Sequence, residues 1–547
     1  MEADNLVCFC AHTLQAFRAW LDAKYGGLEG LNRAWLRRYS AWDEVTPGKL
    51  PDRPYTEMMA FQHFITCRAN AHGKARYDFV KALDPQRPVT VHADTPCALR
   101  GGWPDDYALS RGNDWAFADH LDGVGCSSFP KWGALDDAEF AARVEFVKSA
   151  ARTKRVWLSE VQGGRAAVGF NLFEPVDAPS QQRWIWNGMA CGADTMLFWC
   201  WRDEVFGRES GGFGIIGADG LAEERLAALR KTGALLAAHE DLLAAYRPAQ
   251  PEVGVFFSPQ TYYLHWAQEG EGSRAVSALM GYCRALARRA IPYTVVEEEH
   301  LDALKGIKVL FMPRTLVVDD ATAVVLGEFV KGGGTLVTES ECGAFDSAGL
   351  YRYPADRFTA RLTGVCEIGR RALSGKKVSV KLGKRTLALG VTQWLTPWEK
   401  GDGRVLAAHT DGALLLEIPS GRGRVLLGGA YFGEAYRQDP AKGFEDFVEW
   451  VVRSAGIEAD SQVLAPKATV KEFVFIKHGV ADGKRVVFVF LPKASRQATL
   501  RFKPGFFPSG KVRDIISGKA VILKSADAGQ ECKVTGGALR MAVLTEA

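Results

Sequence analysis

The sequence predicts an α/β protein that contains the C-terminal half of a (β/α)8 TIM barrel, a flavodoxin-like α/β domain and a small all-β domain. Three patterns support this prediction. Apolar runs alternate with helical periodicity in residues 1–248, a doubly wound pattern fills residues 249–460, and short alternating runs fill residues 461–547. Apolar strands separated by helices are typical of parallel βα units, whereas closely spaced alternating strands are typical of all-β modules.

The first part is predicted to be the second half of a barrel. Its apolar runs predict buried strands at residues 88–92, 121–126, 155–160 and 194–201, and its periodic segments predict helices at residues 13–25, 29–36, 56–83, 136–152, 180–190 and 221–245. A complete barrel has eight strands, and its chemistry lies at their C-terminal ends. Because each run ends in polar or aromatic residues, we expect these ends to form an active-site rim.

The second and third parts follow different patterns. The second predicts strands at residues 253–257, 293–296 and 309–312, helices at residues 273–290 and 321–331, and a turn into a further strand at residues 332–338. Gly332–Gly334 lacks the spacing of a phosphate-binding loop, so we expect it to end a helix and start a strand. The third part has strand-like runs at residues 471–477, 485–491, 498–502 and 539–544.

Composition argues against several classes of protein. A net charge of +4 over 547 residues is too small for the basic surface of a nucleic-acid binder. No apolar run approaches the roughly 20 residues of a membrane span. The 11 scattered cysteines predict reduced thiols rather than a disulfide framework, and residues 1–10 lack the basic and apolar regions of a signal peptide. We therefore expect a cytoplasmic protein without nucleic-acid or membrane partners.

Glu160 is the main candidate for chemistry. It ends an apolar strand and precedes Gln162 and two glycines, a position from which a carboxylate faces the cavity of a barrel. Cleavage of a glycosidic bond requires one carboxylate at the anomeric carbon and a second that protonates the leaving oxygen. The alternative is a structural carboxylate that caps the next segment or pairs with Arg202. The 15 tryptophans suit a sugar site, although large cores also contain tryptophan.

Two segments with cysteine suggest other chemistries. Cys8, Cys10 and His12 lack the second ligand pair of a closed zinc site, and we expect no metal and no cofactor. Cys342 follows a strand, as the nucleophiles of amidotransferase-type domains do, but its surroundings lack the G-x-C-x-G elbow and an evident partner histidine. We therefore expect no catalysis by Cys342.

The chain resembles glycoside hydrolase family 42, the β-galactosidases, over essentially its whole length. The runs Cys8-Phe-Cys10, Phe17-Arg-Ala-Trp-Leu21 and Leu31-Asn-Arg-Ala-Trp35 resemble the block that follows barrel strand four in the family. Ser-Phe-Pro around Phe129 resembles the end of strand six, and Ser159–Gln162 resembles the nucleophile strand seven. Phe198-Trp-Cys-Trp-Arg202 followed by Glu209 resembles strand eight, and the second part is similar to the family's trimerisation domain.

The resemblance implies a retaining hydrolase that acts on terminal β-galactosides and forms a homotrimer. It implies that Glu160 is the nucleophile, and that the sugar is bound by Glu209, Trp201, Arg202, Phe129 and Gln162. Of the two tryptophans at the end of the last barrel strand, we favour Trp201 because it lies nearer the rim. Galactose, arabinose and fucose all remain open as the sugar, and so does the linkage.

The resemblance also implies that a catalytic partner is missing. The family's acid/base is a glutamate in an Asn-Glu pair before the cysteine block, whereas Glu2 follows Met1. We therefore expect an N-terminally truncated chain that lacks its acid/base and hydrolyses little by itself, because such proton transfer typically supplies about 10²–10⁴-fold. The alternative is a non-catalytic glycan-binding or assembly protein on a relic barrel.

Overall fold

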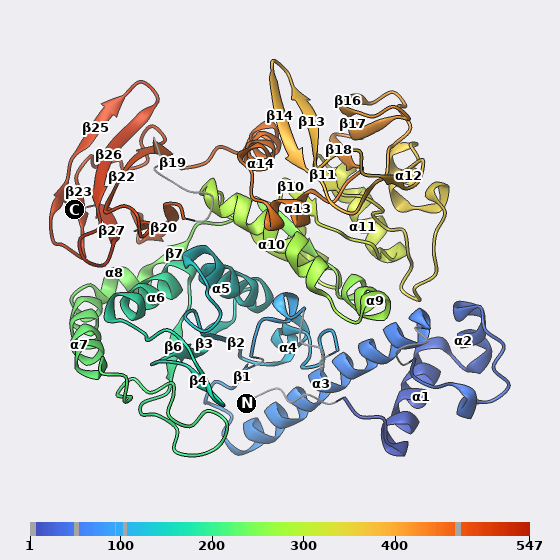
Figure 1. The fold of residues 1–547 in the computed structure, drawn as a ribbon, viewed down its shortest axis with the longest axis horizontal. Helices are drawn as coiled ribbons and strands as arrows, with labels where there is room; N and C mark the ends of the chain where they lie inside the picture. Colours follow the sequence, from blue (N-terminus) through green and yellow to red (C-terminus); the bar gives the residue numbers. More distant parts are fainter. Residues whose placement is uncertain (1–6, 49–53, 93, 102–106, 465–471, 547) are drawn as a thin grey trace. The chain divides into compact units, whose positions relative to one another are not determined.

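The computed structural model describes residues 7–48, 54–92, 94–101, 107–464 and 472–546. The chain divides into two compact units, whose helices and strands are drawn in Figure 1. Unit 1 contains Met1–Leu121, Glu252–Cys283 and Thr294–Ala455, and unit 2 contains Asp122–Pro251, Arg284–Tyr293 and Gly456–Ala547. Glu2 lies outside the described residues.

Unit 2 begins with the parallel βα repeat that the sequence predicts. The strands β2 (Gly123–Ser128), β3 (Arg155–Gln162) and β6 (Thr195–Trp199) pair in parallel in this order. Helix α5 (Asp137–Ala151) connects β2 to β3, and α6 (Ala178–Cys191) connects β3 to β6. The remaining predicted strand is β1 (Thr90–His92), which is part of unit 1. The α/β class predicted for this part of the chain is confirmed.

A capping box fixes the start of α5. The side chain of Asp136 accepts a hydrogen bond from the backbone N–H of Glu139 at 2.9 Å, and the side chain of Glu139 accepts one from the backbone N–H of Asp136 at 3.2 Å. These bonds satisfy N–H groups that a helix start otherwise leaves without a partner. The connection from β2 therefore ends at a defined residue.

One predicted helix of this part is wrong. Residues 221–245 form two helices, α7 (Ala222–Ala238) and α8 (Glu240–Ala245), and not one. The chain leaves helical geometry at His239, which has φ −126° and ψ 25°. Glu240 and Asp241 follow in the first turn of α8, where negative charge is favourable beside the free N–H groups of a helix start.

Unit 1 contains the predicted flavodoxin-like domain. Its seven-stranded sheet has the order β16-β17-β18-β11-β10-β8-β9. Numbered along the chain, the five parallel strands take the order 2-1-3-4-5 of flavodoxin-like folds. The strands are β8 (Val253–Phe257), β9 (Thr294–Glu297), β10 (Val309–Met312), β11 (Thr335–Thr338), β16 (Arg404–Ala408), β17 (Ala413–Ser420) and β18 (Gly423–Gly428). The hairpin of β13 (Lys377–Leu382) and β14 (Arg385–Gly390) is inserted before β16.

The helices of unit 1 belong either to its N-terminal part or to its flavodoxin-like domain. They are α1 (Ala11–Tyr25), α2 (Leu28–Trp35), α3 (Tyr55–Leu83), α4 (Asp114–His120), α9 (Pro259–Glu269), α11 (Asp320–Lys331), α12 (Phe358–Thr363), α13 (Phe432–Gln438) and α14 (Lys442–Ser454), while α10 (Ser273–Arg288) has residues in both units. Gly332 caps α11 and β11 begins at Thr335, as the sequence predicts. A helix that could cross a bilayer is not found in the described ranges, since none is both sufficiently long and sufficiently apolar.

The C-terminal part of unit 2 is the predicted all-β module. Its two antiparallel sheets have the orders β19-β22-β26-β25 and β24-β23-β27-β21-β20-β7. Leu500 and Val534 from the first sheet and Val487 and Leu544 from the second share one apolar core, as in a β-sandwich. The strands are β7 (Arg247–Pro248), β19 (Ser461–Leu464), β20 (Phe475–Ala481), β21 (Lys484–Phe490), β22 (Gln497–Phe502), β23 (Val512–Asp514), β24 (Ala520–Val521), β25 (Leu523–Ala526), β26 (Gly529–Thr535) and β27 (Met541–Glu546).

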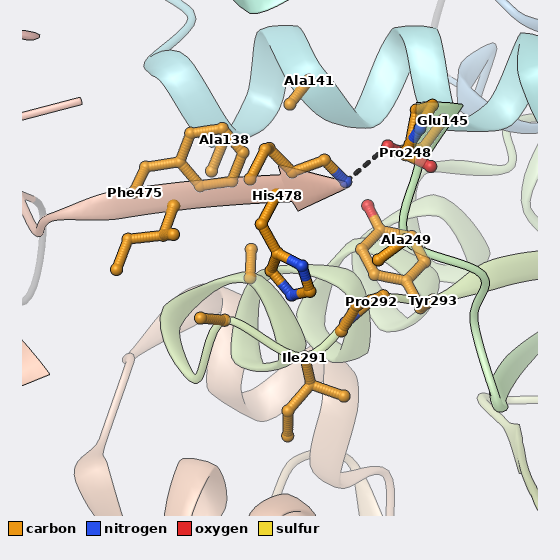
Figure 2. Close-up of a pocket in the computed structure, with 14 residues that line it drawn as sticks. Ala138, Ala141, Glu145, Pro248, Ala249, Ile291, Pro292, Tyr293, Phe475 and His478 are labelled. Atoms are coloured by element: carbon orange, nitrogen blue, oxygen red, sulfur yellow. Dashed lines mark ion pairs between the residues drawn. The ribbon is translucent and has the colours of Figure 1, made fainter. Parts of the chain in front are cut away.

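A small pocket in unit 2 lies where β20 meets α5 (Figure 2). The Nζ of Lys477 lies 2.5 Å from a carboxylate oxygen of Glu145, whose side chain is buried, whereas that of Lys477 is partly buried. The imidazole of His478 points into the pocket toward Pro292 and is 4% exposed. Its ring nitrogens have no hydrogen-bond partner among the described residues, although Nε2 lies 3.6 Å from a carboxylate oxygen of Asp460. Burial outweighs the opposing effect of this carboxylate and lowers the pKa of His478 to about 4.

We predict that His478 makes the stability of unit 2 depend on pH. A histidine in the unfolded chain takes up its proton near pH 6.5, so between about pH 6.5 and 4 the unfolded chain binds a proton that the folded one does not. The stability from this residue is complete above that window and is lost as the pH falls. Urea unfolding should show a loss of about 2 kcal/mol between about pH 7 and about pH 5 that His478→Gln removes. An unchanged pH dependence in His478→Gln would contradict this origin.

Candidate active site

A β-bulge determines the direction of the Glu160 side chain on β3. Leu158 is fully buried and lies against Gly188 of α6, so this face of the strand looks toward the helices. Strict alternation would place Glu160 on the same face. However, Leu158 pairs with Cys126 whereas Glu160 pairs with Ser127, which leaves one extra residue in β3 between these two pairs. The bulge therefore turns Glu160 to the opposite face, an effect that bulges often have beside active sites.

Ser127 holds the carboxylate of Glu160. Its hydroxyl donates a hydrogen bond to Oε2 of Glu160 at 2.9 Å. Ser127 is itself buried, and its carbonyl accepts a hydrogen bond from Nη1 of Arg143 on α5 at 3.2 Å. Glu160 is partly exposed, so it is not sealed beneath apolar side chains. The sequence placed Ser127 only among the polar residues that follow a predicted strand. Its contact with Glu160 was missed, because such a contact gives no signal without the register of the neighbouring strand.

Gln162 fixes the loop that follows β2. It is fully buried, and its Oε1 accepts hydrogen bonds from the backbone N–H groups of Lys131 at 3.0 Å and Trp132 at 3.2 Å. Its Nε2 donates to the carbonyl of Gly164 at 3.0 Å. The sequence predicted Gln162 as a substrate-binding residue, and the structure engages its amide with the backbone beside the end of β3.

Phe129 and Trp132 of this loop belong to an aromatic cluster that also contains Phe213, from the loop after β6. The ring centroids of Phe129 and Trp132 are 5.7 Å apart, and each lies within 5.7 Å of the ring of Phe213. Phe213 is fully buried, whereas Phe129 is partly exposed. Edge-on contacts at such distances are favourable for aromatic rings. The cluster therefore gives a firm apolar wall in which Phe129 and Trp132 are both partly exposed.

Trp201, Arg202 and Glu209 lie in the loop after β6, next to the strand that carries Glu160. Trp201 is 60% exposed, Arg202 is exposed and Glu209 is partly exposed. Asp203 fixes the start of the loop, because its carboxylate accepts hydrogen bonds from two backbone N–H groups of the same loop at 2.9 Å. The predicted sugar-binding side chains thus extend from a backbone that is held in place.

A short hairpin after β3 supports the loop after β6. It is formed by β4 (Ala167–Val168) and β5 (Asn171–Leu172), and the N–H of Gly169 at its turn donates to the carbonyl of Arg208 at 2.7 Å. Arg225 of α7 is fully buried and binds the carboxylate of Asp219 with two hydrogen bonds of 2.8 Å. Such bidentate pairs fix geometry as well as charge, so the loop ends at an anchored point.

The cysteine segments offer little support for other chemistry. Among the described residues, no three His, Cys, Asp or Glu side chains are grouped so that they could hold a metal ion. Hydrogen bonding from Thr13 lowers the pKa of Cys10 to about 6. Cys342 is buried in the core of unit 1, and burial raises the pKa of its thiol well above the ordinary value. A sealed and protonated thiol is a poor nucleophile.

Two family models and several known proteins are similar to this chain in sequence. A family model described as β-galactosidase matches residues 1–237, and one described as β-galactosidase trimerisation domain matches residues 252–425. The β-galactosidase GalA of Bacillus licheniformis is 25% identical over 365 residues, which are 63% of this chain and 52% of that protein. The chain thus spans about half the length of the curated relatives that it matches.

Solved structures show the same fold. The β-galactosidase from Bacillus circulans sp. alkalophilus superimposes with a TM-score of 0.80 at 18% identity, covering 99% of this chain and 77% of that one. The β-galactosidase of the Antarctic haloarchaeon Halorubrum lacusprofundi gives a TM-score of 0.74 at 18% identity, covering 98% and 76%.

We predict that Gln162 stabilises the loop after β2. Gln162→Met leaves two backbone N–H groups without an acceptor, which should cost about 1–3 kcal/mol of stability and speed hydrogen exchange at Lys131 and Trp132. Gln181→Met is the matched control, because Gln181 is also fully buried but its Oε1 has no partner among the described residues. Equal protection of both amides in the two variants would contradict the prediction.

Proposed function

Because the chain belongs to glycoside hydrolase family 42, the β-galactosidase family, we propose that it is a retaining glycosidase that acts on terminal β-galactosides through Glu160. The placement of Glu160 carries this proposal. It lies at the C-terminal end of a parallel strand, is turned away from the helices by a bulge, and is partly exposed. Catalytic residues of (β/α)8 barrels occupy such strand ends.

The proposed reaction has two displacement steps. Glu160 attacks the anomeric carbon, a glycosyl ester forms, and the leaving oxygen departs with the electron pair of the broken bond. Water then attacks the same carbon, loses a proton to the solvent and releases the carboxylate, so the anomeric configuration is retained. We propose that Glu209, Trp201 and Arg202 orient the sugar from the loop after β6.

An aromatic wall beside this loop is proposed to limit where the sugar lies. Phe129, which is partly exposed, offers its ring to an apolar face of the sugar. Gln162, whose amide is engaged with Lys131 and Trp132, acts on the substrate through the position of that loop. An aromatic wall suits a pyranose, because its C–H groups are apolar.

The second carboxylate of a retaining mechanism is assigned to none of the described residues. In the loop after β6, Asp203 is engaged with backbone N–H groups and Asp219 with Arg225. A substrate whose leaving group departs without a proton therefore tests Glu160 by itself. Dinitrophenolate is such a group, since its negative charge is delocalised over the ring.

We also propose that the chain forms a homotrimer in a reducing compartment, the cytoplasm. The match of residues 252–425 to a trimerisation domain supports the trimer. All 11 cysteines, which lie within the described residues, are free thiols, as expected where disulfides do not persist.

We predict that Glu160 is labelled covalently by a dinitrophenyl β-galactoside with fluorine in place of the hydroxyl beside the anomeric carbon. Fluorine slows both displacements, but the dinitrophenolate leaving group speeds the first one, so the glycosyl ester forms faster than it is hydrolysed and accumulates on the nucleophile. Mass spectrometry of the intact chain and of its peptides should find one label, at Glu160. The exposed Glu240→Gln serves as the control and should label normally.

Glu160→Gln should abolish this labelling, because an amide does not attack the anomeric carbon. Labelling that persists in Glu160→Gln would contradict the assignment of the nucleophile. A wild-type chain that binds galactosides but never takes the label would favour the non-catalytic glycan-binding protein over the enzyme.

We predict a particle with three times the 59.9 kDa mass of one chain in light scattering after gel filtration. The seven-stranded sheet and its helices provide a rigid domain that can present the same surface in each copy, and closed symmetry is the rule for homo-oligomers. A mass of one or two chains over a wide range of concentration would contradict the trimer.

A further inference from the structure

Ser127 and Glu160 occupy one register position on neighbouring parallel strands. Their side chains meet at 2.9 Å with the serine hydroxyl as donor. The meeting depends on the bulge in β3, because the regular alternation of a strand would turn Glu160 away from Ser127. The bulge thus sets the register that brings the two side chains to this one hydrogen bond.

The serine is held on its other side as well. Its carbonyl accepts a hydrogen bond from Arg143 at 3.2 Å, and its side chain is 1% exposed. A buried hydroxyl in a paired strand has few alternative directions, so its donor is fixed before any substrate arrives. Preorganised donors of this kind cost little reorganisation during a reaction.

We propose that Ser127 is a positioning residue for the nucleophile, an inference that rests on the function proposed for Glu160. By donating to Oε2, Ser127 fixes the plane of the carboxylate that attacks the anomeric carbon. No proton is transferred to or from the serine. The C–O bond to the carboxylate of Glu160 forms as the bond to the leaving oxygen breaks, and the same hydrogen bond stabilises the carboxylate when water displaces it.

The neighbouring residue provides a matched control. Ser128 lies on the same strand and is also buried, but its hydroxyl has no hydrogen-bond partner among the described residues. Ser127→Ala and Ser128→Ala remove the same atom from adjacent buried positions. A difference between them therefore reports the contact with Glu160 and not the general loss of a buried hydroxyl.

The experiment measures the rate of labelling by the fluorinated dinitrophenyl β-galactoside at increasing concentration and pH. Ser127→Ala should lower the maximal labelling rate about tenfold, because a hydrogen bond to a charged group is lost, with little change in the concentration for half-saturation. The acid limb of the pH profile should move to higher pH, since the carboxylate loses a donor that favours its charged form. Ser127→Thr should restore both the labelling rate and the pH at which the rate falls on the acid side. Ser128→Ala should match the wild type in both.

The outcomes separate this inference from the proposed function. A wild-type chain that takes no label at Glu160 overturns the nucleophile and, with it, the role of Ser127. A labelled wild type with an equally fast Ser127→Ala, or an equal loss in Ser128→Ala, overturns the positioning role alone. Urea midpoints of the two alanine variants show whether either has lost stability, and a slow Ser127→Ala that Ser127→Thr does not rescue also counts against the inference.

Discussion

The extra residue in β3 is the constraint on which the candidate site depends. A strand presents alternate side chains to opposite faces, so an insertion of one residue exchanges the faces of everything beyond it. Leu158, before the bulge, lies against Gly188 of α6. Glu160, after it, meets Ser127 across the opposite face. Without the bulge, the carboxylate would be directed at the apolar layer between sheet and helices, where an isolated charge is costly to bury.

The sequence predicted the parts of the site that depend on local patterns. Apolar runs located β2, β3 and β6, and the polar residues at their ends pointed to Glu160 and to the loop of Trp201 and Glu209. The bulge and the partner at Ser127 could not be predicted, because both are properties of strand pairing. The order of the flavodoxin-like sheet is likewise set by non-local pairing. The break at His239 was missed because periodicity continues on both of its sides.

In the flavodoxin-like domain, the carboxyl ends of the strands do not form a candidate catalytic site. Ligands of such folds bind beyond the carboxyl ends of parallel strands, and here that region is filled by the protein's own charges. Arg314, after β10, is buried and bonded to Glu434. Glu339, after β11, accepts from Tyr282 and from two backbone N–H groups, and burial raises its pKa to about 7. Cys342, which also follows β11, is 1% exposed in the apolar core of unit 1, so it is removed from solvent.

The two loops of the candidate site hold one another. Gln162 bonds the loop after β2 that carries Phe129 and Trp132, and buried Phe213 of the loop after β6 packs against both of their rings. Asp203 and Arg225 hold the loop after β6 at two further points, while Trp201, just before Asp203, is 60% exposed. An aromatic wall that is held in this way can fix the plane of a sugar ring, whereas an exposed side chain beside it can adjust to the bound sugar.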